Sequence, residues 1–315
     1  MTDAPTAAMT NEKKTTAPEN YINRVTFGAR LKQYARSPLS LILMILVMLA
    51  ALFSVGMLIF IIAYILINGV PHLTAEQFDW NYTTENVSMM PAIINTLIMT
   101  AMTLVIAVPI GVFAAVYLVE YAKRGNKLVK VIRVTTETLS GIPSIVFGLF
   151  GYLMFGVAFH WGYSMLSGAL TLAIMVLPSI MRTTEEALKS VPDSYREGSF
   201  GLGAGKLRTV FVVILPSAIP GILAGVILAI GRITGETAAL IYTAGTVPGI
   251  PTTKLSGIPI FDMMASGRTL AIHMYALLNE GLYTEQAYAT AVVLLVMVLL
   301  INALSAFVAK KFTRS

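Results

Sequence analysis

Long stretches of apolar sequence without charged residues dominate this chain of 315 residues. The first begins after Arg36 and meets no charged side chain before His72. A helix that crosses a bilayer needs about 20 predominantly apolar residues, and six stretches reach that length. Only 12% of the residues are charged, against about 25% in soluble domains. The sequence therefore predicts an all-α integral membrane protein whose six transmembrane helices lie near residues 41–69, 93–118, 138–159, 161–181, 216–242 and 287–309.

Lysine and arginine are distributed unevenly between the connecting segments. Six precede residue 41, five follow the second predicted helix, five follow the fourth and three follow the sixth, whereas the other connections contain only Lys254 and Arg268. Because short basic loops stay in the cytoplasm, both termini are predicted to be cytoplasmic. Residues 1–36 are then a cytoplasmic tail, and residues 37–315 form the membrane domain. The same bias explains the net charge of +6 without a nucleic-acid partner.

The connection between the fourth and fifth helices, residues 182–216, has the amphipathic pattern of ordered structure. Residues 184–191 can form one short helix, which Pro192 must interrupt because a proline disfavours helical geometry in the residue before it. Ser194 and Glu197 have the S-x-x-E spacing of a capping box. A second short helix is therefore expected to begin there, with the preceding aspartate as a competing cap.

Glycines at positions 198, 201, 203 and 205 follow closely. Glycine adopts positive φ angles without penalty, so the second short helix is expected to end within about two turns. Tyr195, Phe200 and Leu202 would then be large apolar groups facing the cytoplasm, which favours a partner surface. The run GLGAGK is not a phosphate-binding loop, because Phe200 and Leu207 stand where that motif has glycine and serine or threonine.

Two charged residues, Arg232 and Glu236, interrupt the apolar sequence of the fifth predicted helix. A charge at the centre of a membrane helix costs about 2.5 to 3.5 kcal/mol. The i,i+4 spacing would place both on one helical face, where they could pair with each other and specify helix packing. Alternatively, ionisable residues inside a membrane mark a transport path, and the planar donor fork of arginine suits phosphate. The G-x-x-x-G repeats at 221–225 and 231–235 allow another helix to approach closely.

Residues 182–216 resemble the coupling loop of type I ABC importer permeases, whose pattern is E-A-A, three residues, G, nine residues and I-x-L-P. The sequence has E-G-S at 197–199, glycine at 203 and V-I-L-P at 213–216, so it departs from the pattern only by small or conservative replacements. This resemblance implies a six-helix permease fold whose coupling helix docks into a separate ATPase subunit. With the apolar groups above, the candidate coupling residues are Glu197, Gly198, Ser199, Gly203, Tyr195, Phe200 and Pro216.

Three further segments resemble the phosphate-specific ABC permeases, most closely their A-type subunit. They are AIGRITGETAALIYTAG at 229–245, GIPSIVFGLFG at 141–151 and R-T-T-E at 182–185. The resemblance covers about residues 90–312 and implies import of inorganic phosphate across the plasma membrane of a prokaryote. Pro143 can kink the third helix beside the path.

The phosphate-permease resemblance implies that Arg182, Glu185 and Arg232 lie on the anion path. Glu236 joins these candidates from its spacing alone. Since a carboxylate repels an anion, Glu236 would either orient Arg232 or accept a hydrogen bond from the proton that hydrogen phosphate carries and sulfate lacks.

The implied partners are a second phosphate permease subunit, a dimer of ATPase subunits that binds ATP and magnesium, and a soluble phosphate-binding protein. The chain itself is expected to bind no cofactor and to catalyse no reaction. It contains no cysteine, and its three histidines are far apart, so no metal site is expected. Two alternatives remain open: a permease for another oxyanion, and a secondary carrier that needs no ATP.

Overall fold

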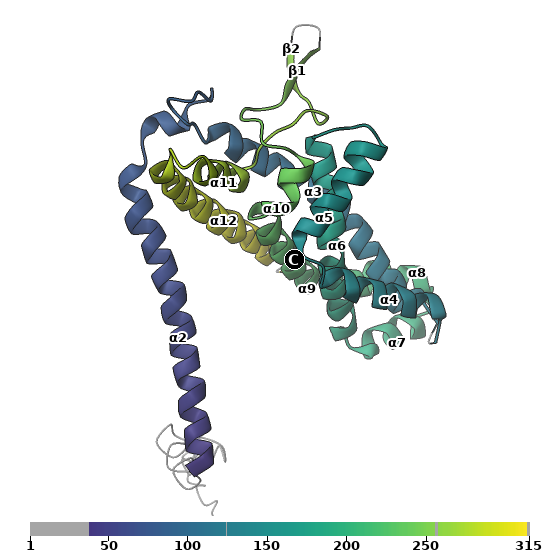
Figure 1. Ribbon diagram of the computed structural model, residues 1–315. Coiled ribbons are helices and arrows are strands. Elements are labelled where there is room, and N and C mark those ends of the chain that lie inside the picture. Colours follow the sequence, from purple (N-terminus) through teal and green to yellow (C-terminus); the bar gives the residue numbers. More distant parts are fainter. Residues whose placement is uncertain (1–37, 124, 256–257, 314–315) are drawn as a thin grey trace, which may run out of the picture. The chain divides into compact units, whose positions relative to one another are not determined.

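The computed structural model describes residues 38–123, 125–255 and 258–313, and helices dominate it (Figure 1). The predicted tail, residues 1–36, lies outside the described residues. The first helix, α2, spans Pro38–Gly69 and is long and apolar enough to cross a membrane. It contains the boundary between two compact units of the chain, the second of which begins at Ile62.

Four further helical segments, all in the second unit, are long and apolar enough to cross a membrane. Within the described residues they bring the candidate spans to five, and a bent helix pair counted as one span makes six. The predicted all-α membrane fold is therefore confirmed. The four segments are α3 (Met90–Val116) with the π-helical turn Tyr117–Tyr121, α6 (Met165–Ser190), the run from α8 (Lys206–Arg208) through the π-helical turn Thr209–Ile214 into α9 (Leu215–Thr234), and α12 (Thr284–Thr313).

The third predicted helix is the bent pair. It consists of α4 (Lys127–Ser140) and α5 (Ser144–Gly151), which continues as π-helical residues 152–158, and the two halves meet at 107°. Pro143 lies at the break with φ −60° and ψ 144°. A proline pushes the preceding residue towards extended geometry, which ends α4 here. The kink at the proline is confirmed, and α4 begins well before the predicted span.

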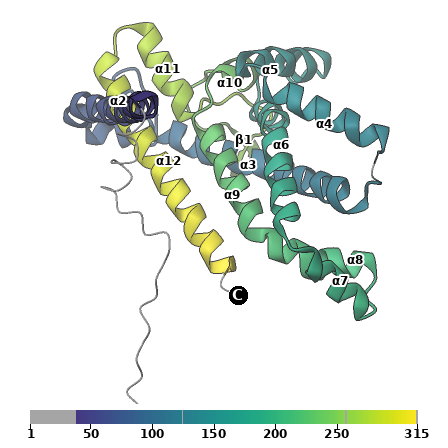
Figure 2. The same cartoon turned by 90° about the horizontal axis from the view of Figure 1, so that it is seen from below.

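The central helix of the second unit is α6. Of its most apolar window, 67% is buried, against 11–33% for the other long helices of this unit. α3, α5, α9 and the short helix α10 (Ala238–Thr243) pack around it (Figures 1 and 2). Met99, Phe147, Leu172 and Leu240 are among the buried side chains at these contacts.

Glycine allows α9 to lie directly against α6. A Cβ atom at Gly221 would lie 2.5 Å from the Cβ of Ala187, and one at Gly225 would lie 2.7 Å from the Cβ of Thr183. The first predicted G-x-x-x-G repeat thus packs against a helix of the same chain. The repeat at 231–235 makes no comparably close approach to the described residues.

The sequence prediction of a separate helix at 184–191 is wrong, because α6 continues to Ser190 and the fourth span is longer than predicted. Two features support the extension. Glu185 and Lys189 form an i,i+4 ion pair, which stabilises helices. Leu188 is fully buried in a cluster that joins the ends of α3, α6 and α9.

The predicted coupling helix, α7, spans Asp193–Gly201. Its N-cap is Pro192, without a side-chain cap, so the predicted capping box at Ser194 is wrong. The cause is the preceding proline, whose fixed φ and extended ψ make it the N-cap, so the helix starts two residues earlier than a cap at Ser194 would place it. The predicted glycine stop is confirmed: α7 ends at Gly201, and Gly203 has φ +81°.

A small hairpin departs from the all-helical prediction. β1 (Thr252–Leu255) and β2 (Ile258–Phe261) pair antiparallel, with Thr252 opposite Phe261. The hairpin lies at the opposite end of the second unit from α7 (Figure 1). The same connection contains α11 (Leu270–Glu280), and the turns of 3-10 helix at 70–72 and 75–78 precede α3.

Candidate functional site

Ionisable side chains from α4, α6 and α9 line one pocket of about 450 Å³. It brings together three of the four predicted path residues, Arg182, Glu185 and Arg232. The glycine contacts of α9 with residues 187 and 183 place Arg232 opposite about residue 176 of α6, roughly 9 Å along the helix from Arg182. The remaining lining residues are Arg133, Thr136, Glu137, Ser140, Pro178, Ser179, Glu186 and Lys189.

Glu185 is held between two cations. Its Oε2 accepts hydrogen bonds from Arg133 Nη2 at 3.3 Å and from Lys189 Nζ at 2.9 Å. The Glu185 side chain is 13% exposed, whereas both cations are about half exposed (51%). This ion-pair network links α4 to the last turns of α6 and neutralises Glu185, so this carboxylate would not repel an anion in the pocket.

The two arginines differ in their partners. Arg182 Nε donates to Glu186 Oε1 at 3.2 Å, but both side chains are largely exposed, and such pairs are weak. Arg232 lies in the last turn of α9, where a cation is favoured by the helix dipole. Among the described residues, its side chain makes no hydrogen bond or ion pair. The described residues therefore leave the N–H donors of its guanidinium unused.

Glu236 does not lie where the sequence predicted. α9 ends at Thr234 with Gly235 as its C-cap, so Arg232 and Glu236 are not on one continuous helical face. The Oε1 atom of Glu236 instead accepts a hydrogen bond of 3.1 Å from the backbone N–H of Ala239 at the start of α10. This side chain caps a short helix and is not among the residues that line the pocket.

The predicted coupling residues lie on and beside α7. Tyr195 and Phe200 are about half exposed, Leu202 is 91% exposed, and Glu197 is exposed as well. A Cβ atom added at Gly198 would meet nothing within 4 Å. α7 and the residue after it thus present exposed apolar side chains, and Glu197 lies among them.

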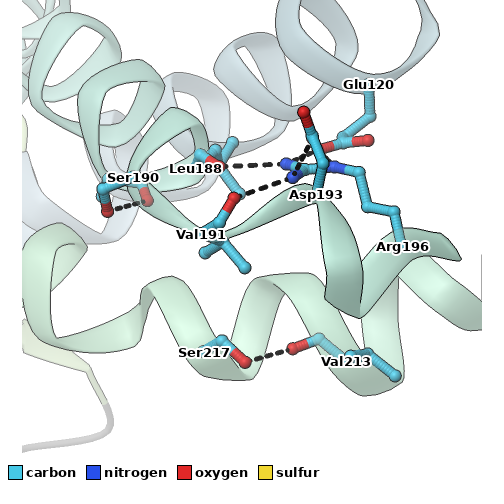
Figure 3. Close-up of polar contacts among 9 residues, drawn as sticks. Glu120, Leu188, Ser190, Val191, Asp193, Arg196, Val213 and Ser217 are labelled. Atoms are coloured by element: carbon cyan, nitrogen blue, oxygen red, sulfur yellow. Dashed lines mark hydrogen bonds and ion pairs between the residues drawn. The ribbon is translucent and has the colours of Figure 1, made fainter. Parts of the chain in front are cut away.

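Two further predicted coupling residues, Ser199 and Pro216, lie in α7 and α9. Ser199 is hydrogen bonded to Thr209 through their hydroxyls at 2.8 Å, which ties α7 to the π-helical turn before α9. Pro216 lies in the first turn of α9, and the next residue, Ser217, donates its hydroxyl to the carbonyl of Val213 (Figure 3).

Arg196 fixes α7 to the rest of the unit (Figure 3). Its guanidinium donates to Glu120 Oε1 at 2.7 and 3.2 Å, and to Asp193 Oδ1 at 3.1 Å. It also donates to the backbone carbonyls of Leu188 and Val191 at 3.0 and 2.9 Å. The hydrogen bond to Glu120, more than any opposing effect of burial, raises the pKa of Arg196 above its ordinary value.

A second cavity, of about 620 Å³, is lined by Glu120, Asp193 and Arg196 of this contact. Arg133 and Lys189 line it as well, and both also line the charged pocket. The ion-pair network around Glu185 therefore forms a wall common to the two cavities.

A buried polar cluster lies nearer the hairpin end. His273 is fully buried, and Arg268 is only 4% exposed. The ring of Tyr82 contacts both: Arg268 Cζ is 4.7 Å from its centroid, and the imidazole packs edge-on at 6.1 Å. Burial and, secondly, the charge of Arg268 lower the pKa of His273 to about 3.

Four residues of these contacts were missed as site residues. Arg133 was counted only as a cytoplasmic-loop cation, and no local pattern shows that α4 brings it to α6. The spacing of Glu185 and Lys189 would have indicated their pair. Glu120 and Arg196 are 76 residues apart, and their pairing depends on the tertiary fold.

Comparison with known proteins places the chain in a family. The model of the family "Binding-protein-dependent transport system inner membrane component" matches residues 107–314. The probable ABC transporter permease protein YqgI of Bacillus subtilis is 37% identical over 268 residues, 81% of this chain and 89% of that protein. The phosphate transport system permease protein PstA of Pasteurella multocida is 34% identical over 258 residues, 81% and 88% of the two chains.

Solved structures share the fold. A chain of a bacterial ABC transporter involved in the import of the acidic polysaccharide alginate aligns with a TM-score of 0.61 at 15% identity, over 90% of this chain and 99% of that one. A chain of the MetNI methionine ABC transporter aligns with a TM-score of 0.53 at 19% identity, over 80% and 98%. The chain therefore belongs to the inner membrane components of binding-protein-dependent transport systems, and it is an ABC importer permease, the non-catalytic membrane subunit of such a transporter.

Proposed function

We propose that this permease imports inorganic phosphate and that the anion passes through the pocket between α4, α6 and α9. The observation that carries the proposal is that the guanidinium of Arg232, which lines the pocket, has no hydrogen-bond or ion-pair partner among the described residues. The pocket is lined by four cations and three carboxylates, and the ion pairs described above occupy the other three cations, Arg133, Arg182 and Lys189. Arginine offers a planar fork of donors that matches two phosphate oxygens at once. The relative from Pasteurella multocida, named a phosphate permease, supports the same substrate.

Glu137 takes the role that the sequence suggested for Glu236. It lines the pocket, and its carboxylate has no ion pair within the described residues. Hydrogen phosphate carries a proton that a carboxylate can accept in a hydrogen bond, whereas sulfate carries none near neutral pH. Glu137 would therefore favour phosphate over sulfate, while Glu236 maintains the start of α10.

The proposal includes the topology and partners of the transporter. Both termini and α7 lie in the cytoplasm, where a dimer of ATPase subunits binds the surface of Tyr195, Phe200 and Leu202. ATP and magnesium bind to those subunits. A second permease subunit completes the path, and a soluble phosphate-binding protein delivers the anion to the hairpin end. The membrane is the plasma membrane of a prokaryote, the inner membrane in Gram-negative cells.

Reconstitution with these partners in proteoliposomes tests the proposal. We expect uptake of labelled phosphate that requires ATP and the binding protein, and that excess sulfate does not inhibit. The variant Glu137→Gln should admit sulfate as a competitor, with Glu236→Gln as the matched control. Equal competition by sulfate in the unmodified transporter would indicate a permease for another oxyanion, and uptake without ATP by this chain alone would indicate a carrier.

A further inference from the structure

One guanidinium, that of Arg196, holds three elements together. It pairs with Glu120, which lies in the π-helical turn at the end of α3, and with Asp193 at the start of α7. It also caps the end of α6, because the carbonyls of Leu188 and Val191 lie where the helical ladder has no further N–H donors. A cation is also favoured at a helix C-terminus.

The contact between Arg196 and Glu120 is shielded from solvent more than the ion pairs of Glu185 and Glu186 are. The side chain of Arg196 is 17% exposed and that of Glu120 is 9% exposed, whereas Arg182 and Glu186 are 76% and 66% exposed. Ion pairs that are shielded from water and hydrogen bonded in several directions keep a fixed geometry. The contact can therefore transmit a movement of α7 to the ends of α3 and α6. An exposed ion pair, whose geometry changes easily, could not.

The same end of α3 contacts the chain beyond α7 as well. The ammonium group of Lys206 lies 5.1 Å from the centroid of the Tyr121 ring. Arg196 precedes the apolar residues Phe200 and Leu202, and Lys206 follows them. The exposed apolar residues are thus flanked in the sequence, before and after, by residues that contact the turn at the end of α3.

The attachment reaches the charged pocket through α6. Leu188 and Val191, whose carbonyls Arg196 binds, flank Lys189 and the end of α6. Lys189 pairs with Glu185, and Glu185 pairs with Arg133 of α4. Arg196 is therefore connected, through the end of α6, to the ion pairs of the residues that line both cavities.

We propose that Arg196 is the positioning residue that makes α7, the end of α3 and the end of α6 move as one body, so that displacement of α7 by the ATPase changes the charged pocket. This inference rests on the proposed function. It assigns to one side chain the transmission between ATP hydrolysis and anion movement. Arg196 touches neither ATP nor phosphate.

Three variants test the role of Arg196 in the assembled transporter. Glu120→Gln keeps the shape of the side chain but removes the negative charge that pairs with Arg196. Arg196→Gln removes the positive charge and the hydrogen bonds to the carbonyls at the end of α6. Arg196→Lys keeps the positive charge but lacks the planar donor fork of the guanidinium. Arg208→Gln is the matched control, because Arg208 is an exposed cation on α8 of the same loop. The measured quantity is phosphate transported per ATP hydrolysed, with the retention of the ATPase subunits as the test of assembly.

We expect Arg196→Gln to lower this ratio at least 10-fold while ATPase subunits remain bound and hydrolyse ATP. Glu120→Gln and Arg196→Lys should give intermediate ratios, and Arg208→Gln should match the unmodified protein. A ratio unchanged in Arg196→Gln, with uptake and hydrolysis intact or reduced in proportion, would overturn the inference. If the unmodified complex shows no ATP-dependent phosphate uptake, the proposed function fails instead.

A distance measurement keeps the inference testable if Arg196→Gln assembles poorly. Since the chain has no cysteine, spin labels can be attached at single introduced cysteines replacing Ser190 at the end of α6 and Leu202 beyond α7. We expect one narrow distance distribution that ATP binding leaves unchanged, and a broad one after Glu120→Gln. A distribution that is broad in the unmodified protein, or equally narrow in the variant, would contradict a rigid connection.

Discussion

Replacing Gly225 with alanine tests whether α6 and α9 must stay in direct contact to form the charged pocket. The added Cβ would lie 2.7 Å from the Cβ of Thr183, and closer still to its hydroxyl. Carbon atoms in contact stay about 3.5 to 4.0 Å apart, so the two helices must separate by roughly 1 Å. Rotation of Thr183 gives no relief, because its Cβ stays fixed and its hydroxyl is hydrogen bonded to the carbonyl of Ser179 at 2.9 Å.

The expected loss of stability follows from two opposing effects. Overpacking of a tight contact costs about 1–3 kcal/mol, and replacing glycine by alanine inside a helix returns about 0.5–1 kcal/mol. A net loss of about 0.5–2 kcal/mol lowers the apparent Tm by a few degrees. The same separation moves Arg232 away from Arg182, so phosphate uptake should fall more than the folded fraction does.

Thermal unfolding of the purified protein in detergent, together with uptake by the reconstituted transporter, measures both effects of Gly225→Ala. Gly198→Ala is the control, because a Cβ there meets nothing within 4 Å; its apparent Tm should stay equal or rise slightly. Combining Gly225→Ala with Thr183→Gly transfers the small residue to the facing helix and should restore uptake. A Gly225→Ala variant with unchanged Tm and uptake would refute the packing argument.

Three further predictions concern other parts of the chain. Glu236→Ala should lower the free energy of unfolding by about 1 kcal/mol through loss of the cap on α10, as thermal unfolding can measure. Glu236→Gln should keep both this stability and the rate of phosphate uptake. Because the folded-state pKa of His273 is about 3, below its ordinary value of 6.5, the unfolded state binds the proton first as pH falls. His273 should therefore reduce stability by about 1.4 kcal/mol per pH unit between about pH 6 and pH 4, and His273→Gln should unfold with less pH dependence over that range. Gly203→Ala places a side chain at φ +81°, which costs about 1–2 kcal/mol, and less ATPase should copurify with it.

The long elements were predictable because their causes are local. Apolar length predicted the candidate spans, a proline predicted the bend between α4 and α5, and clustered glycines predicted the end of α7. The end of α6 was predicted wrongly, since its apolar run stops near Met181 while Leu188 is buried against helices from elsewhere in the chain. Tertiary burial extended a helix that hydropathy alone would have ended.

The end of α9 has a local signal in the sequence, Gly235, but the apolar residues on both sides of it led to the prediction of one continuous helix. The apolar residues resume at Ala238, so residues 216–242 resemble one span, yet Gly235 is a typical helix C-cap. Glu236 follows it and accepts a hydrogen bond from the next helix. The role of Arg133 had no such signal, because its distance from Glu185 depends on the 107° bend and on how α4 then packs.

The most direct test of the anion path is phosphate uptake by an Arg232→Lys variant of the reconstituted transporter. Lysine keeps the positive charge in the last turn of α9 but cannot bind two phosphate oxygens with one planar fork. Arg208→Lys, an exposed position outside the pocket, is the control. We expect Arg232→Lys to assemble and to hydrolyse ATP normally but to import phosphate at least 10 times more slowly, a loss of about 1.4 kcal/mol of stabilisation on the path. Uptake equal to that of the unmodified transporter, at equal expression, would contradict it.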